Sequence, residues 1–111
     1  MKIEKRKNGD VTVLDIKGKI LIGDGVAELR EAINESVDNK ENKLLLNFEN
    51  VPYLDSTGLG EVVRSYTSVK NRGGVVKIVN LTNKVKDLLS VTKLITVFET
   101  FEDESKAVES F

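Results

Sequence analysis

The sequence predicts an α/β fold in which a mixed sheet packs against helices. Apolar runs typical of strands alternate with segments whose apolar residues recur at helical spacing, so the expected order is β-β-β-α-β-α-β-α-β-α. One run, Lys43–Phe48, is apolar without alternation, as in a strand buried on both faces of a partly parallel sheet. At 111 residues, we expect one domain spanning residues 1–111.

The first elements are expected to be two short strands joined by a hairpin. Ile3 lies in the first strand, Asn8-Gly9-Asp10 is a turn signal, and Val11–Ile16 forms the second strand. Gly18 should end that strand, and Ile20–Ile22 should resume as an extended edge.

A first helix is expected after this edge. Asp24 can cap it, because a short side-chain acceptor satisfies the free amides of a first turn. Its apolar face is predicted to consist of residues at helical spacing: Val26, Leu29, Ile33 and Val37.

A second helix is expected after the central strand and a linking segment, Val51–Leu54. The sequence Asp55-Ser56-Thr57-Gly58 precedes it, and Arg72-Gly73-Gly74 should end it, since glycine adopts the left-handed conformation that closes helices. Its apolar stripe, expected to face the core rather than a partner, is Leu59, Val62, Val63, Tyr66 and Val69.

The last third of the chain is predicted to continue the alternation. Val75–Val79 is the next strand, and Thr82 can cap a helix that runs through Leu89. Thr96–Phe98 is predicted to be a short final strand, and an acidic helix should span about residues 103–109.

The residue counts exclude several classes of site. The chain has no cysteine and no histidine, so disulfides, thiolate nucleophiles, serine–histidine triads and His-ligated zinc are all absent. A formal net charge of −1 and 5% aromatic residues argue against nucleic-acid binding. No apolar run approaches a membrane span, and the charged N-terminus has no apolar signal region, so we expect a cytoplasmic protein without a membrane partner.

The most informative segment is Leu54–Glu61, which places Ser56 where a strand gives way to a helix. The simplest interpretation is a helix cap, since Asp-Ser-Thr suits a helix start. A hydroxyl at this position is also suited to phosphorylation, because the free amides and helix dipole favour an anion there. Gly58 and Gly60 are not explained by a cap, and they suggest that another backbone or a bulky ligand approaches closely.

Catalysis by Ser56 is not expected. A nucleophilic serine needs a base within hydrogen-bond reach, and Asp55 is adjacent in sequence and points elsewhere in most turn geometries. Lys77 or Lys84 is the formal alternative base, but no recognised nucleophile–base arrangement is present. We therefore expect no enzyme activity, no cofactor, no metal and no small-molecule substrate.

The segment Val51–Gly60, preceded by the strand Leu44–Phe48 and followed by Arg72–Lys77, resembles the STAS domain. It is most similar to the bacterial anti-sigma factor antagonists, and the resemblance covers nearly the whole chain. It implies a four-to-five-stranded mixed sheet with about four helices packed mainly on one face. It also implies that Ser56 is the serine phosphorylated by a partner anti-sigma factor, with Thr57 as an alternative acceptor.

In such a system the unphosphorylated antagonist binds the anti-sigma factor, a serine kinase, and thereby frees the sigma factor. Phosphorylation releases the antagonist, and a serine phosphatase resets it. The partner-binding residues implied by this resemblance and by the segment around Ser56 are Asp24, Asp55, Ser56, Thr57, Gly58, Gly60 and Glu61.

One departure from the family pattern concerns the segment before the first helix. Many members carry an acidic residue directly after a turn there, facing the kinase, whereas the nearest acid after Gly18 in this chain is displaced to Asp24. The alternative function is a STAS subunit that is not phosphorylated and docks in a signalling scaffold or in a transport or lipid-trafficking complex.

Overall fold

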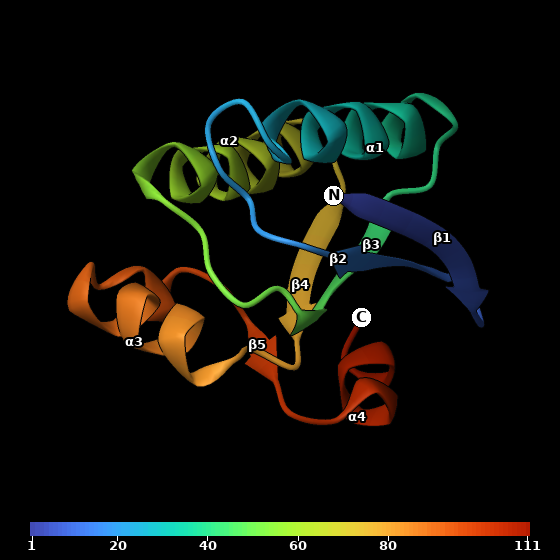
Figure 1. The fold of residues 1–111 in the computed structure, drawn as a ribbon. Coiled ribbons are helices and arrows are strands. Elements are labelled where there is room, and N and C mark those ends of the chain that lie inside the picture. Colours follow the sequence, from blue (N-terminus) through green and yellow to red (C-terminus); the bar gives the residue numbers. More distant parts are fainter.

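The computed structural model describes residues 1–111 as five strands, four α-helices and one 3₁₀ turn (Figure 1). The strands are β1 (Lys2–Asn8), β2 (Val11–Lys17), β3 (Lys43–Asn50), β4 (Val75–Val79) and β5 (Thr100–Phe101). The helices are α1 (Val26–Asp38), α2 (Ser56–Asn71), α3 (Asn83–Val91) and α4 (Glu104–Glu109), and the 3₁₀ turn is Leu94–Thr96.

The five strands form one mixed sheet in the order β1-β2-β3-β4-β5. β1 pairs antiparallel with β2 through the hairpin at Gly9 and Asp10, and the remaining neighbours are parallel. β3 is the middle strand, as its apolar run without alternation predicts, and Leu44 to Phe48 are all buried. The predicted α/β class with a mixed sheet is therefore confirmed.

The main core lies between one face of the sheet and the crossover helices. Alternation along β3 directs Leu44, Leu46 and Phe48 to this face, where Leu29 of α1 and Val62 of α2 join them. α3 contributes Val85 and Leu89 to the same core. Three of the four helices thus cover one face, which confirms the predicted arrangement.

A smaller core lies on the opposite face beneath α4. Val13, Leu45 and Val79 of the sheet pack with Ala107 of α4, and Phe111 lies against them. Figure 1 shows α4 on the side of the sheet away from α1 and α2. α4 therefore closes the face that the crossover helices leave open.

Two predicted strands are wrong. Ile20–Ile22 forms only isolated bridges, from Ile20 to Leu54 and from Leu21 to Asp24 and Gly25, because the chain turns back at Gly23 and Leu21 bonds to Asp24 instead of to a neighbouring strand. Thr96–Phe98 is also not a strand. Phe98 is 4% exposed and packs edge-to-face on Tyr66, and β5 forms two residues later at Thr100–Phe101.

Two predicted caps also need correction. The N-cap of α1 is Gly25, with φ +102°, and Asp24 makes no capping hydrogen bond. Thr82 does occupy the N-cap position of α3, but its hydroxyl donates to the carbonyl of Val51 at 3.0 Å rather than accepting from the helix. That bond ties the start of α3 to the end of β3.

None of the helices has both the length and the apolar sequence that a membrane span requires.

Candidate functional site

The start of α2 exposes two hydroxyl side chains behind a carboxylate cap. Asp55 is the N-cap, in extended backbone, and its Oδ1 accepts from the backbone N–H of Gly58 at 2.7 Å. Ser56 and Thr57 are the first two residues of the helix and are exposed. Because Asp55 supplies the cap, the hydroxyl of Ser56 is not required for it and remains accessible from solvent.

The second oxygen of Asp55 holds the β2–α1 connection. Oδ2 accepts from the backbone N–H of Ile22 at 3.1 Å. Backbone hydrogen bonds from Gly58 and then Ile22 hold the pKa of Asp55 below its usual value of 3.8, so the carboxylate is ionised at neutral pH. One side chain thus fixes both the helix start and the neighbouring turn.

The two glycines of the segment have different roles. A Cβ on Gly58 would lie 1.9 Å from the carbonyl oxygen of Ile20, so this position must be glycine for the β2–α1 connection to pass. A Cβ on Gly60 would meet nothing within 4 Å. The close approach predicted from the glycine pair therefore comes from this chain's own backbone at Gly58, and Gly60 lies on open surface.

The turn beside Ser56 is short and tightly hydrogen-bonded. The N–H of Leu21 donates to the carbonyl of Asp24 at 2.6 Å, and the N–H of Asp24 donates back to Leu21 at 2.9 Å. Asp24 is exposed and lies 3.8 Å from the terminal ammonium of Met1. The turn presents Ile22, whose exposed fraction is 72%.

Glu61 is placed differently from the other expected partner-binding residues. It is 3% exposed, and its carboxylate accepts from Arg30 of α1 at 2.7 Å and from Arg64 of α2 at 2.8 Å. Burial would raise the pKa of Glu61, but the hydrogen bonds from Arg64 and Arg30 outweigh it and lower the pKa. The carboxylate therefore joins α1 to α2 inside the molecule and does not face solvent.

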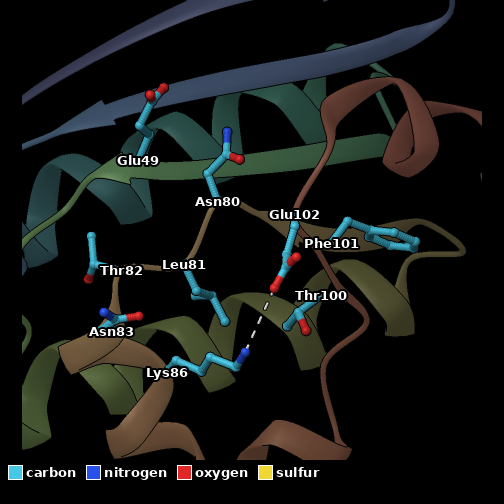
Figure 2. A pocket seen from close by; sticks show the side chains of 9 residues that line it. All are labelled: Glu49, Asn80, Leu81, Thr82, Asn83, Lys86, Thr100, Phe101 and Glu102. Atoms are coloured by element: carbon cyan, nitrogen blue, oxygen red, sulfur yellow. Dashed lines mark ion pairs between the residues drawn. The ribbon is translucent and has the colours of Figure 1, made fainter.

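A cavity lies elsewhere, at the carboxyl ends of the parallel strands. It has a volume of about 560 Å³, and its lining includes Asn80 after β4, Thr82 and Lys86 of the α3 segment, and Glu102 after β5. Figure 2 shows these side chains around the cavity, with Lys86 directed toward Glu102. The side chains at the start of α2 are not among its lining residues, so it is separate from the Ser56 site.

No group of three or more carboxylates lies close enough to hold a metal ion.

The model of the STAS domain family matches residues 2–107. The chain belongs to the STAS domain family.

Relatives of this STAS domain support the assignment over most of its length. A candidate anti-sigma factor antagonist of Thermotoga neapolitana is 28% identical over 100 residues, which is 90% of this chain and 88% of that protein. The anti-sigma-B factor antagonist of Bacillus subtilis is 39% identical over 51 residues, 46% of this chain and 47% of that protein.

A solved structure agrees with the fold. The crystal structure of a candidate anti-sigma factor antagonist from Thermotoga maritima has a TM-score of 0.89 and 25% identity, covering 97% of this STAS domain and 92% of that chain. The similarity therefore extends through the whole sheet and its helices.

The structure brings most of the expected site residues together, and it places Ile22, which is not among them, on the neighbouring turn. Asp55, Ser56, Thr57 and Gly58 are contiguous, and the hydrogen bond from Ile22 places the Asp24 turn beside them. The apolar run Ile20–Ile22 predicts an edge strand, so Ile22 is not among the residues expected at this site. The signal that could have found it is the spacing of Gly23 and Gly25 directly after the apolar run, which predicts a turn that leaves the last apolar residue exposed.

Proposed function

We propose that this STAS domain is an anti-sigma factor antagonist that binds an anti-sigma factor serine kinase, frees a sigma factor, and is released by phosphorylation of Ser56. The observation that carries the proposal is the exposed Ser56 at the first turn of a helix that Asp55 already caps. Thr57 is the alternative acceptor. A serine phosphatase would return the domain to its binding form.

The proposed contact surface follows the geometry of the site. Ser56, Thr57 and Gly60 supply it from α2, Asp55 from the N-cap position before that helix, and Asp24 from the neighbouring turn. Gly58 acts through shape, because it lets the turn lie against the helix. For Glu61 we propose a positioning role between α1 and α2, since its carboxylate is buried.

Physical chemistry supports a switch at Ser56. A phosphoryl group would add about 1.5 to 2 negative charges at the exposed, positive end of α2, so the helix itself can accommodate it. The same charge would lie beside the ionised Asp55, within the surface that meets the partner. Phosphorylation is thus expected to disrupt the complex without unfolding the domain.

The test uses the anti-sigma factor kinases of the source organism, purified and incubated with this domain and ATP. We expect one kinase to add a single phosphoryl group to the wild-type chain, seen by intact-mass spectrometry, and no label on Ser56→Ala. Ser105→Ala is the matched control, since Ser105 is also an exposed serine in the first turn of an Asp-capped helix. Its labelling should equal that of the wild type.

Binding is then measured with the same kinase in the absence of ATP. Ser56→Ala should bind like the wild type, and Ser56→Asp should bind at least about tenfold more weakly because of the added charge. Equal binding by both variants would contradict the switch. Equal recovery of another assembly by wild-type and Ser56→Asp baits, with Ser56 unmodified under all growth conditions, would favour the scaffold, transport or lipid-trafficking function.

A further inference from the structure

Two of the five large apolar side chains that are exposed on this domain belong to segments next to the Ser56 site, the β2–α1 turn and the segment that leads into α2. Ile22 is 72% exposed and Tyr53 is 45% exposed. The remaining three are Val75 at the start of β4, Val91 at the end of α3 and Val97 directly after the 3₁₀ turn. Single exposed apolar residues are ordinary on protein surfaces, so a binding role for Ile22 needs an argument beyond its exposure.

That argument is the way in which the backbone of Ile22 is fixed. Its N–H donates to the Asp55 carboxylate, and the N–H of Ile20 donates to the carbonyl of Tyr53 at 3.2 Å. The reciprocal hydrogen bonds between Leu21 and Asp24 close the turn around it. The β2–α1 connection is thus held at several points against the segment that leads into α2.

A side chain presented by such a turn is suited to binding. Ile22 loses little backbone freedom when a partner covers it, because the turn is already ordered in the free domain. Covering the exposed part of its side chain removes apolar surface from water, and this is favourable. The partner surface that fits is an apolar pocket, facing the first turn of α2.

An apolar contact at this place also explains why a phosphoryl group would disrupt binding. A dianion can be accommodated at the exposed helix start, where water and free amides surround it. Once an apolar partner surface covers Ile22 beside it, the dianion must lose much of its hydration next to the Asp55 carboxylate. The phosphoryl group would therefore disrupt the complex in two ways, through the cost of its desolvation and through its repulsion by the Asp55 carboxylate.

We infer that Ile22 is an apolar anchor for the anti-sigma factor, and that its contact makes binding sensitive to phosphorylation of Ser56. This inference rests on the function proposed above. It assigns to a side chain of the β2–α1 turn a role in both affinity and switching.

The test measures affinity by titration calorimetry with the purified kinase that phosphorylates Ser56. We expect Ile22→Ser to bind at least about tenfold more weakly than the wild type, as is usual when a central apolar anchor is truncated, and Ile22→Val to restore most of the affinity. Val91→Ser is the control, since Val91 is 80% exposed but lies at the end of α3. Its affinity should stay within about twofold of the wild-type value, because fully exposed side chains away from an interface contribute little.

The switching role is measured in the same titrations. The ratio of affinities between unphosphorylated and phosphorylated domain should be smaller for Ile22→Ser than for the wild type. Circular dichroism should show unchanged folding, because the substituted side chain is exposed. Tight binding by the wild type together with equal binding by Ile22→Ser would overturn this inference alone, whereas a wild-type chain that binds none of the kinases would overturn the proposed function as well.

Discussion

Gly58 and Gly60 differ sharply in what surrounds them, although both lie in the first turns of α2. The carbonyl of Ile20 occupies the space that a side chain at residue 58 would need, whereas residue 60 faces open space. Glycine inside a helix costs up to about 1 kcal/mol relative to alanine. At residue 58, packing requires a glycine in spite of that cost. At residue 60, nothing in the packing of the free domain requires one.

We predict opposite effects of alanine at these two positions. Gly58→Ala should lower the free energy of unfolding by about 3 kcal/mol, because the new methyl group collides with backbone that cannot easily move. Gly60→Ala should raise it by up to about 1 kcal/mol through helix propensity. Urea titration of both variants checks this, and a stabilised Gly58→Ala would show that the Ile20 carbonyl does not lie against the helix.

Asp55 is the residue through which the helix start and the neighbouring turn are joined. Asp55→Ala removes the acceptors for the N–H groups of Gly58 and Ile22 together. We expect the melting temperature to fall by roughly 4–8 °C, as for loss of a helix cap in a domain of this size. Hydrogen exchange at the Ile22 amide should become faster, and Asp103→Ala, which removes the cap of α4, should leave that amide unchanged.

Only some residues of the site can be placed correctly from the sequence. Ser56 could be found because its neighbours have strong helix-start chemistry. Glu61 could not be placed, because the spacing of residues on α2 does not show that Arg30 of α1 lies across from it. Because Arg30 is distant from Glu61 in sequence, the position of this carboxylate between Arg30 and Arg64 can be recognised only when α1 and α2 are packed together.

At the scale of elements, Glu61 connects α1 to α2 through Arg30, whose guanidinium remains half exposed. We expect Glu61→Gln to lower the free energy of unfolding by about 2 kcal/mol at pH 7, less than for fully buried pairs because the arginines reach solvent. Chemical denaturation measures this difference directly. Glu31→Gln, an exposed change on α1, should have no measurable effect.

The same pair of variants predicts a dependence on pH. The pKa of Glu61 is lowered in the folded domain from its ordinary value of 4.5, so its contribution is fully present above that value and is lost as the pH falls through the folded pKa. The difference in stability between wild type and Glu61→Gln should therefore be constant at neutral pH and shrink below about pH 4.5. A difference that grew on acidification would contradict a lowered pKa.

Elements with a strong sequence pattern were predicted correctly, and those defined by few contacts were not. The run Lys43–Phe48 is unambiguous because an apolar strand without alternation must be covered on both sides. The short β5 has only Thr100 and Phe101, and the preceding Phe98 resembles a strand residue although it packs on Tyr66. Local pattern cannot separate an apolar residue in an edge strand from one that a loop directs into the core.

At the scale of the whole molecule, Arg6 links the first strand to the last helix. Its guanidinium donates to Asp15 of β2 and to Glu104 of α4, with the shortest contacts at 2.7 and 2.6 Å. These hydrogen bonds, to Glu104 first and then to Asp15, raise the pKa of Arg6, and Asn8 also donates to Glu104 at 2.8 Å. The ends of the chain are thereby joined over the second face of the sheet.

We predict that Arg6→Ala loosens α4. Because Arg6 is 41% exposed, the loss of stability should be modest, about 1 kcal/mol. Hydrogen exchange at the amides of Ala107 and Phe111 should be faster, while amides of α1 keep their wild-type rates. Lys2→Ala is the control, since its ion pair with Glu4 is fully on the surface, and faster exchange of α4 in that variant would contradict a specific role for Arg6.

The close contact of Ile20 with Gly58 separates two properties of the proposed contact surface that could otherwise change together. These are the choice of partner and the geometry of Ser56. The base of the β2–α1 turn is fixed against α2 by backbone atoms, so its position depends little on which side chains the turn carries. If this domain has the function proposed above, substitutions at Leu21, Ile22 and Asp24 should alter which partner is recognised while Ser56 keeps its geometry. In a cell with several such domains, the proposed switch at Ser56 could then be kept in common while duplicated copies diverge in partner choice.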